Sequence, residues 1–141
     1  RDFLLDHDRM RWTINGARFE MLRTQLSVER GAVEIWQFRN PPGGMPHPVH
    51  MHGFPFRMLE RRGSPEQVRR LAVDESGLAP AETGWKDTFL LWPGERVRVA
   101  IDLAHDYPGE QVYMLHCHNL EHEDQGMMLN VRIVPPGRAH A

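Results

Sequence analysis

The segment ERVRVAIDL, residues 95–103, shows the clearest strand pattern in the chain. Its apolar residues alternate with charged or small ones. The apolar set is Val97, Val99, Ile101 and Leu103, and the set between them is Arg96, Arg98, Ala100 and Asp102. Alternation with a period of two predicts a strand that buries one face. On both sides of it, β-prone runs separated by glycine and proline turns occur in MRWTINGARFEM (10–21), QLSVERGAVEIWQFRN (25–40), GFPFRMLER (53–61), DTFLLWPGE (87–95), QVYMLHC (111–117) and MMLNVRIV (127–134).

These runs predict seven or eight short strands, a number typical of an antiparallel sandwich or a Greek-key barrel. In the segment 25–40 we expect Val33 and Ile35 to supply buried positions, with Trp36 and Phe38 as further candidates. The dipeptide Asn15-Gly16, flanked by β-prone residues, predicts a hairpin turn. The fold class that follows is all-β.

The composition fits one soluble domain, because 141 residues with 40% hydrophobic and 26% charged content can bury a core without disulfides. We expect this domain to span 1–134, with an irregular insertion at about 63–84 and a tail at 135–141. The charged run ERRGSPEQVRR (60–70) is interpreted as a solvated loop. A net charge of -2 gives no reason to expect nucleic acid or a membrane surface as a partner.

The ends of the chain and its single cysteine say little about where the protein works. The chain begins RDFLLDHD, without an initiator methionine or a signal peptide, and we interpret it as a piece of a longer protein. No apolar run approaches the roughly 20 residues that a membrane helix needs. One cysteine excludes an internal disulfide, so cysteine usage does not indicate the redox compartment.

Six of the nine histidines fall in two short clusters. The first cluster is HPVHMHG, with His47, His50 and His52, and the second is HCHNLEH, with His116, His118 and His122. The other three, His7, His105 and His140, stand in polar or terminal contexts, where a solvated or core histidine is the ordinary interpretation. The clustering itself indicates metal binding.

Strand geometry separates the cysteine from its neighbours. Residues two apart in a strand point the same way, and the residue between them points to the opposite face. His116 and His118 therefore share a face, while Cys117 points away from them. His50 and His52 form a second pair of this kind, so two neighbouring strands would gather four imidazoles at one site. The sequence predicts two metal sites back to back.

The ligand types around Cys117 favour a blue-copper centre. A thiolate, two imidazoles and a weak thioether ligand form the set found in such electron-transfer sites. Cys117, His122 and Met127 are spaced five residues apart, so one loop can supply three ligands, and His47 would complete the set. Structural zinc normally uses more cysteines or closed Cys/His spacings. A cupin iron site would need a carboxylate and a distant third histidine. Met127 could also be a core methionine.

The two motifs resemble those of a known family. HPVHMHG and HCHNLEHEDQGMM are similar to HPxHxHG and HCHxxxHxxxGM, the two C-terminal copper motifs of the multicopper oxidases. The similarity runs from about Trp12 to Val134 and includes GWKDT at 84–88, and it is greatest to the bacterial laccase-like and cuprous-oxidase branch. It implies a cupredoxin-like Greek-key β-sandwich, the last cupredoxin domain of such an enzyme.

The resemblance also implies a role for each clustered residue. His47, Cys117, His122 and Met127 would bind the type 1 copper, His50 the type 2 copper, and His52, His116 and His118 the type 3 pair. Glu123 matches an acidic position that relays protons in the family, although a solvated carboxylate is an equal alternative. The implied reaction takes single electrons from a reducing substrate at the type 1 copper and passes them through Cys117 to the cluster that reduces dioxygen to water.

One departure from the family pattern is decisive. The oxygen-reducing cluster needs eight histidines in four HxH-type pairs, and this chain supplies two pairs. We therefore expect an N-terminal cupredoxin domain as a partner, and we do not expect the isolated chain to reduce oxygen. The alternatives are a stand-alone blue-copper electron carrier and a copper-binding or storage domain.

The reducing substrate is left open by the sequence. The eight methionines are dispersed, which weakens a specialised cuprous oxidase, although Met45 and Met51 lie near His47. A small phenol-like donor or Cu(I) is the expected substrate class. The family resemblance implies a periplasmic or secreted location.

Overall fold

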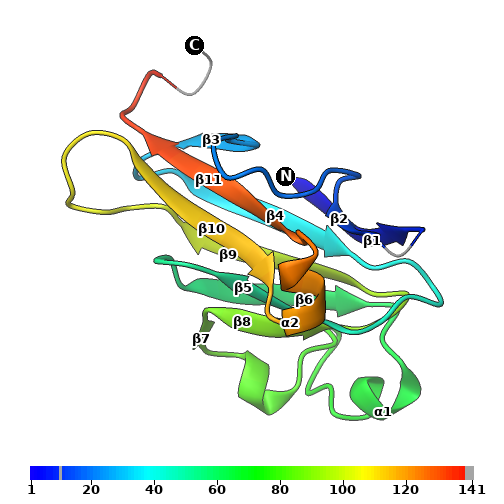
Figure 1. Cartoon of the computed structure of the whole chain (residues 1–141). Coiled ribbons are helices and arrows are strands. Elements are labelled where there is room, and N and C mark those ends of the chain that lie inside the picture. The colour runs from blue at the N-terminus through cyan, green and yellow to red at the C-terminus, as the bar shows by residue number, and fades with distance from the viewer. Residues whose placement is uncertain (10, 139–141) are drawn as a thin grey trace.

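The computed structural model describes residues 1–9 and 11–138, which form two β-sheets packed against each other (Figure 1). The strands of the first sheet, in spatial order, are β2 (Arg11–Ile14), β1 (Asp2–Asp8), β4 (Val33–Arg39), β9 (Arg96–Asp102), β6 (Phe56–Arg62) and β7 (Trp85–Lys86). Those of the second sheet are β3 (Leu26–Glu29), β11 (Met128–Val134), β10 (Gln111–Cys117), β5 (His47–Met51) and β8 (Thr88–Leu91). The all-β sandwich predicted from the sequence is confirmed.

Strand β9 is central to the first sheet, where it pairs antiparallel with both β4 and β6. Val97, Val99 and Ile101 are buried, together with Leu103 just beyond the strand, as their alternation predicts. Most strand pairs are antiparallel, as the strand pattern predicted, and two pairs, β1 with β4 and β3 with β11, are parallel. The apolar faces of both sheets contribute to one hydrophobic core.

The predicted burial in strand β4 is confirmed for Trp36 and Phe38 and wrong for Val33 and Ile35. Trp36 and Phe38 are buried, while Val33 is 69% exposed and Ile35 is 40% exposed. Both faces of this strand carry apolar residues, so the alternation alone does not show which face is buried. The indole and phenyl rings occupy the core face, where they pack against Phe3 of β1: Trp36 is tilted at a centroid distance of 5.2 Å and Phe38 is stacked at 5.0 Å.

The Asn15-Gly16 turn is formed, with positive φ angles of 53° and 74°, but it does not join two long strands. It closes a single bridge between Ile14 and Ala17. The real partner of β2 is β1, which the sequence pattern did not predict as a strand. The described residues form eleven strands in all, and β1 and β7 account for part of the difference from seven or eight.

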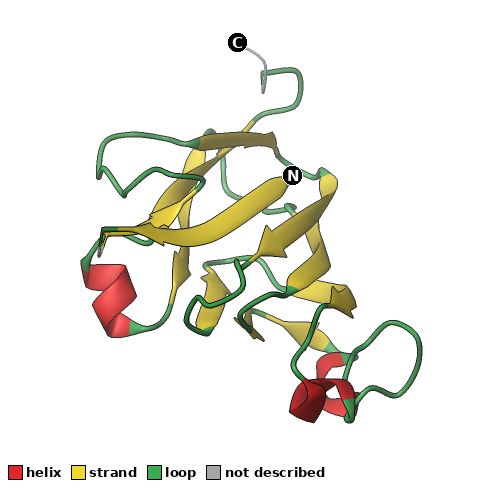
Figure 2. Ribbon diagram, turned by 90° about the vertical axis from the view of Figure 1, so that its right-hand side faces the viewer, coloured by secondary structure: helices red, strands yellow, loops and turns green. Residues whose placement is uncertain are grey.

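The helical segments lie at the edges of the sandwich (Figure 2). They are α1 (Glu66–Arg69), the 3-10 turn η1 (Pro80–Glu82) and α2 (Leu120–Asp124). Both α1 and η1 fall in the segment 63–84 that was predicted to be irregular. No helix among the described residues is long and apolar enough to cross a membrane.

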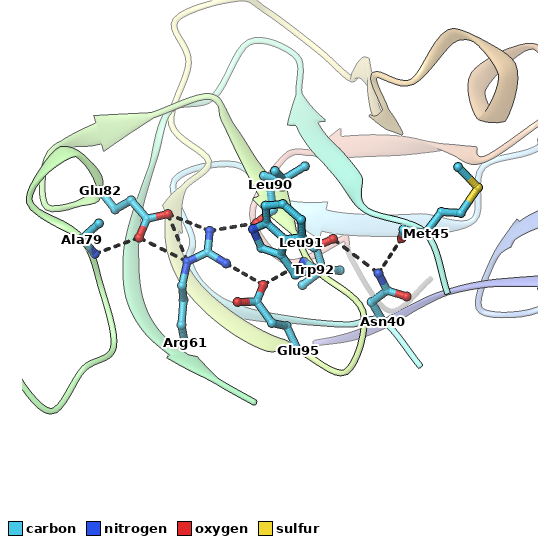
Figure 3. A network of polar contacts seen from close by, with 9 residues as sticks. All are labelled: Asn40, Met45, Arg61, Ala79, Glu82, Leu90, Leu91, Trp92 and Glu95. Atoms are coloured by element: carbon cyan, nitrogen blue, oxygen red, sulfur yellow. Dashed lines mark hydrogen bonds and ion pairs between the residues drawn. The ribbon is translucent and has the colours of Figure 1, made fainter. Parts of the chain in front are cut away.

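The charged run 60–70 contains one residue that is not solvated. Arg61 is buried, and its guanidinium contacts the carboxylates of Glu82 at 2.7 Å and Glu95 at 2.6 Å (Figure 3). The same group donates to the carbonyl of Leu90 in β8. Buried charges are stable only when they are paired in this way. Arg61 thus joins β6 of the first sheet to η1 and to an edge strand of the second.

Candidate metal centres

The site is organised by the antiparallel pairing of β5 with β10. Their register places His116 opposite His50 and Cys117 opposite Val49. Both strands lie inside the second sheet, with β8 and β11 on their outer sides, so their relative position is fixed by hydrogen bonds on both edges. Side chains on opposite faces of this pair reach two separate clusters.

The first cluster is buried and consists of His47, Cys117 and His122. The Nδ1 atoms of the two histidines are 3.1 Å apart, and the Cys117 Sγ lies 3.6 Å from Nδ1 of His47 and 3.5 Å from Nδ1 of His122. All three side chains are at most 1% exposed. Strand β5, strand β10 and helix α2 each supply one of them.

Helix α2 brings His122 to the cluster after a short turn. The Asn119 side chain accepts a hydrogen bond from the backbone N–H of Glu121 and so caps the helix at its start. At the other end, the Met127 N–H donates to the His122 carbonyl and the Cys117 N–H donates to the Met127 carbonyl. The three predicted ligands of this loop are therefore tied together by backbone bonds, and Met127 is fully buried.

Burial changes the acidity of these ligands. Desolvation, with a smaller contribution from the nearby His122, lowers the pKa of His47 to about 4. Desolvation also lowers the pKa of His122 and raises the pKa of the Cys117 thiol to about 11. At neutral pH the two imidazoles are therefore neutral with a free lone pair, and the thiol keeps its proton. A metal that binds here replaces that single proton.

The first cluster fits a three-coordinate metal centre. With metal–nitrogen and metal–sulfur bonds of about 2.0 and 2.3 Å, a planar trigonal N₂S site has ligand atoms roughly 3.5 Å apart. The observed separations of 3.1 to 3.6 Å agree with this size. Two imidazoles and one thiolate are the donor set of a blue-copper site.

The second cluster lies on the opposite face of β10 and consists of His50, His52 and His116, with His118 beside it. The Nε2 atoms of His52 and His116 are 2.9 Å apart, and a metal can reach one nitrogen of each of the three clustered imidazoles, since those atoms lie within 4.8 Å of one another. The His118 ring is 5.8 Å from that of His50 and 5.4 Å from that of His116, between centroids.

Hydrogen bonds orient the histidines of the second cluster. Nδ1 of His50 lies 2.9 Å from the Asp87 carbonyl and 2.8 Å from the Thr88 hydroxyl, both in the segment GWKDT. Nδ1 of His116 lies 3.2 Å from the Cys117 carbonyl. A histidine held through Nδ1 presents Nε2 to a metal. The second cluster therefore offers Nε2 atoms, whereas the first offers Nδ1 atoms.

Glu123 stands close to the second cluster, on helix α2. Its carboxylate oxygen is 3.4 Å from Nδ1 of His116. Desolvation lowers the pKa of His116 despite this carboxylate. The same effect lowers the pKa of His52. His118 is exposed and His50 and His52 are half-buried, so this cluster faces outward, unlike the first.

Two sets of contacts were not predicted from the sequence. One is the Asp87 and Thr88 anchor of His50, which only the β5–β8 pairing reveals. The other is Trp12, whose indole stacks on the His122 ring with centroids 3.7 Å apart. No spacing rule could connect residues 110 positions apart.

The three remaining histidines lie outside both clusters. His7 is exposed, in agreement with its polar context. His105 lies near Phe54 and Tyr113, and within the described residues neither of its buried ring nitrogens has a hydrogen-bond partner, so it is not a satisfied core histidine. His140 lies outside the described residues.

Comparison with known proteins adds independent information. The family model described as "Multicopper oxidase" matches residues 2–137. The bilirubin oxidase of Albifimbria verrucaria is 39% identical over 128 residues, which cover 88% of this chain and 20% of that protein. The laccase of Bacillus subtilis is 40% identical over 116 residues, which cover 75% of this chain and 21% of that protein.

Solved structures give the same result. The crystal structure of the McoA multicopper oxidase from the hyperthermophile Aquifex aeolicus superposes with a TM-score of 0.79 and 38% identity, covering 95% of this chain and 29% of that one. The multicopper oxidase of Pediococcus acidilactici superposes with a TM-score of 0.76 at 30% identity, and the match covers 98% of this chain and 26% of that one. The chain spans only about a fifth of the length of the two curated relatives.

Proposed function

Because this chain belongs to the multicopper oxidase family, and is its C-terminal type of domain, we propose that it accepts electrons for an oxygen-reducing enzyme. His47, Cys117, His122 and Met127 hold the type 1 copper. His50 provides a ligand for the type 2 copper, and His52, His116 and His118 provide ligands for the type 3 pair. Joined to the other domains, the chain takes part in one-electron oxidation of a small donor coupled to reduction of dioxygen to water.

The single observation that carries this proposal is the adjacency of the two clusters along β10. Cys117 is buried among the ligands of the first cluster, and His116, its neighbour in the chain, contributes to the second. One peptide unit therefore links two metal sites by covalent bonds. A stand-alone electron carrier would have no use for the second cluster, so the arrangement favours an oxidase.

Copper, when bound, supplies one-electron redox chemistry at the first centre and dioxygen chemistry at the second. The chain supplies the setting for it. Complete burial of Cys117 and His122 keeps water from the thiolate. The Asp87 carbonyl and the Thr88 hydroxyl hold His50 in place through Nδ1. Glu123 is the proposed proton-holding group beside the second cluster, and its distance of 3.4 Å from His116 supports this role.

The partner in this proposal is the N-terminal cupredoxin domain of the same enzyme. The second cluster supplies four of eight histidines and faces outward, which suits a site completed by another domain. A small reducing substrate, phenol-like or Cu(I), is the proposed electron source, and the proposed location is periplasmic or secreted.

Copper loading of the chain tests the first centre. The loaded protein should be blue, with intense thiolate-to-copper absorption, and Cys117→Ser should abolish that absorption. His118→Ala is the matched control, because His118 belongs to the second cluster and its loss should leave the blue colour. A colourless protein that retains only zinc would refute the assignment.

The second cluster is tested in the whole enzyme. There, His118→Ala should stop oxygen consumption while the blue absorption stays, because electrons still reach the first centre but not dioxygen. Unchanged oxygen consumption would exclude His118 from the oxygen-reducing cluster.

A further inference from the structure

The first cluster is sealed from solvent by its own ligands and by Trp12. His47, Cys117, His122 and Met127 are each at most 1% exposed. Trp12 of β2 lies flat on His122, with an interplanar angle of 27°, and edge-on to His47 at 5.7 Å between centroids. A donor molecule at the surface therefore cannot touch either imidazole directly.

Trp12 also lines a cavity of about 250 Å³. The lining residues are His7, Trp12, Gly43, Gly44, Met45, Glu121 and Gln125, and none of them is a ligand of the first cluster. Trp12 therefore contacts both this cavity and the His122 ring. A larger cavity of about 510 Å³ lies elsewhere, between the start of β1 and residues 23–26.

The cavity walls indicate which kind of donor fits. An indole and the Met45 thioether offer apolar, polarisable surface, and aromatic rings stack favourably on such surfaces. The volume is below the roughly 300–1,000 Å³ of pockets for drug-sized ligands, so it suits a single ring. Glu121, the one carboxylate among the residues that line the cavity, is an acceptor for a hydroxyl or amino hydrogen and disfavours anionic donors.

We propose that Trp12 is the electron-entry residue of this chain, against which a small neutral aromatic donor, such as a hydroquinone, docks in the cavity formed with Met45 and Glu121. The inference rests on the proposed type 1 copper at the first cluster. For a hydroquinone, one O–H bond breaks, the proton passes to solvent water, and one electron leaves the ring. That electron crosses the stacked indole and imidazole of Trp12 and His122 and reduces the cupric ion held there.

Single-turnover kinetics on the copper-loaded chain test this role. In the absence of oxygen, the blue, copper-loaded chain is mixed with excess hydroquinone or with a non-aromatic inorganic reductant. The rate at which its blue absorption bleaches is then measured. Trp12→Leu should slow bleaching by hydroquinone about tenfold or more, because it removes the docking face and the contact to His122. Trp12→Phe, which keeps a ring in place, should restore most of the rate. Bleaching by the inorganic reductant should change less than about twofold, since its transfer needs no stacked contact.

Trp85→Phe is the matched control, because Trp85 is 59% exposed on β7 and should alter neither rate. Equal hydroquinone rates in Trp12→Leu and the parent chain would refute the entry role while leaving the copper assignment intact. Equal slowing with both reductants would also refute it, since that result would show that the substitution altered the copper site itself. A chain that never turns blue would instead overturn the proposed function.

A measurement on the unaltered chain does not depend on how Trp12→Leu folds. Benzyl alcohol, a redox-inert aromatic alcohol, should compete with hydroquinone and slow bleaching, but should not slow the inorganic reductant. It should also shift a tryptophan fluorescence component that is absent from Trp12→Phe. No competition and no shift would contradict docking against Trp12.

Discussion

At residue 117 the backbone places two kinds of chemistry on opposite sides of one strand. The Cys117 side chain lies among Nδ1 atoms in a fully buried cluster, and the neighbouring His116 faces Nε2 atoms in an outward-facing one. This separation follows from the alternation of strand side chains, so the sequence was sufficient to predict it. The Trp12 contact was not predictable, because it depends on how the first sheet packs on the second.

Burial of His47 makes the stability of the metal-free chain depend on pH. The folded pKa of about 4 lies below the unfolded value near 6.5, so the unfolded chain takes up the proton first as the pH falls. We expect the contribution of His47 to the free energy of unfolding to be fully present above pH 6.5. It should be lost between pH 6.5 and 4, which lowers the free energy of unfolding by about 3 kcal/mol at most. Urea unfolding at several pH values measures this. His47→Gln should reduce the slope in that interval, while the buried His122, whose pKa is also lowered, keeps part of it. An unchanged slope would show that His47 is not responsible.

Gly53 limits the packing beside His52. Its φ is +77°, and a Cβ atom there would lie 2.4 Å from the Tyr113 ring. We expect Gly53→Ala to lower the free energy of unfolding by about 1–3 kcal/mol, because it adds both backbone strain and a clash. Gly84→Ala is the control, since nothing lies within 4 Å of a Cβ at Gly84. Thermal unfolding of both variants checks this, and equal losses would contradict it.

At the scale of elements, the predictability of each strand depends on how distinct its two faces are. Strand β9 was predicted correctly because arginine and valine alternate along it. Strand β4 was predicted only in part, because apolar residues occur on both of its faces and the sequence does not show that Trp36 and Phe38 pack against Phe3. Strand β1 was missed because its pairing with β2 and β4 supplies the regularity that its sequence lacks.

Helix α2 is short, so its cap should matter. Asn119 accepts the Glu121 N–H at the helix start, and the helix positions His122. We expect Asn119→Ala to lower the free energy of unfolding of the metal-free chain by about 1 kcal/mol, whereas Asn119→Asp, which keeps an acceptor, should cost only a few tenths. Chemical denaturation compares the two. If both variants lose the same stability, the cap is not the cause.

At the scale of the whole molecule, the two sheets are joined by polar groups as well as by the core. Asn40, which follows β4, donates to the carbonyls of Met45 and Leu91, and Arg61 of β6 donates to that of Leu90 (Figure 3). The bonds to Leu90 and Leu91 reach the edge strand β8 from the first sheet. Charge pattern alone predicted Arg61 to be solvated, because the sequence does not show that Glu82 and Glu95 surround it.

This network makes a strong prediction for stability. Arg61→Met should lower the free energy of unfolding by about 3–5 kcal/mol, because it leaves the buried Glu95 carboxylate without its charged partner. Arg62→Met is the matched control on the same strand. The Arg62 side chain is 45% exposed, so its loss should cost less than about 1 kcal/mol. Urea unfolding followed by circular dichroism measures both, and similar losses would contradict a special role for Arg61.

The register of β10 against β5 has a consequence for how this chain can change over evolutionary time. Because His116 lies opposite His50, one inserted or deleted residue within β10 would turn every following side chain to the other face of the sheet. The thiol would then face the outward cluster and an imidazole the buried one, so a single event would destroy both sites. The length of β10 therefore cannot change by one residue without loss of both clusters, which ties the two clusters to each other.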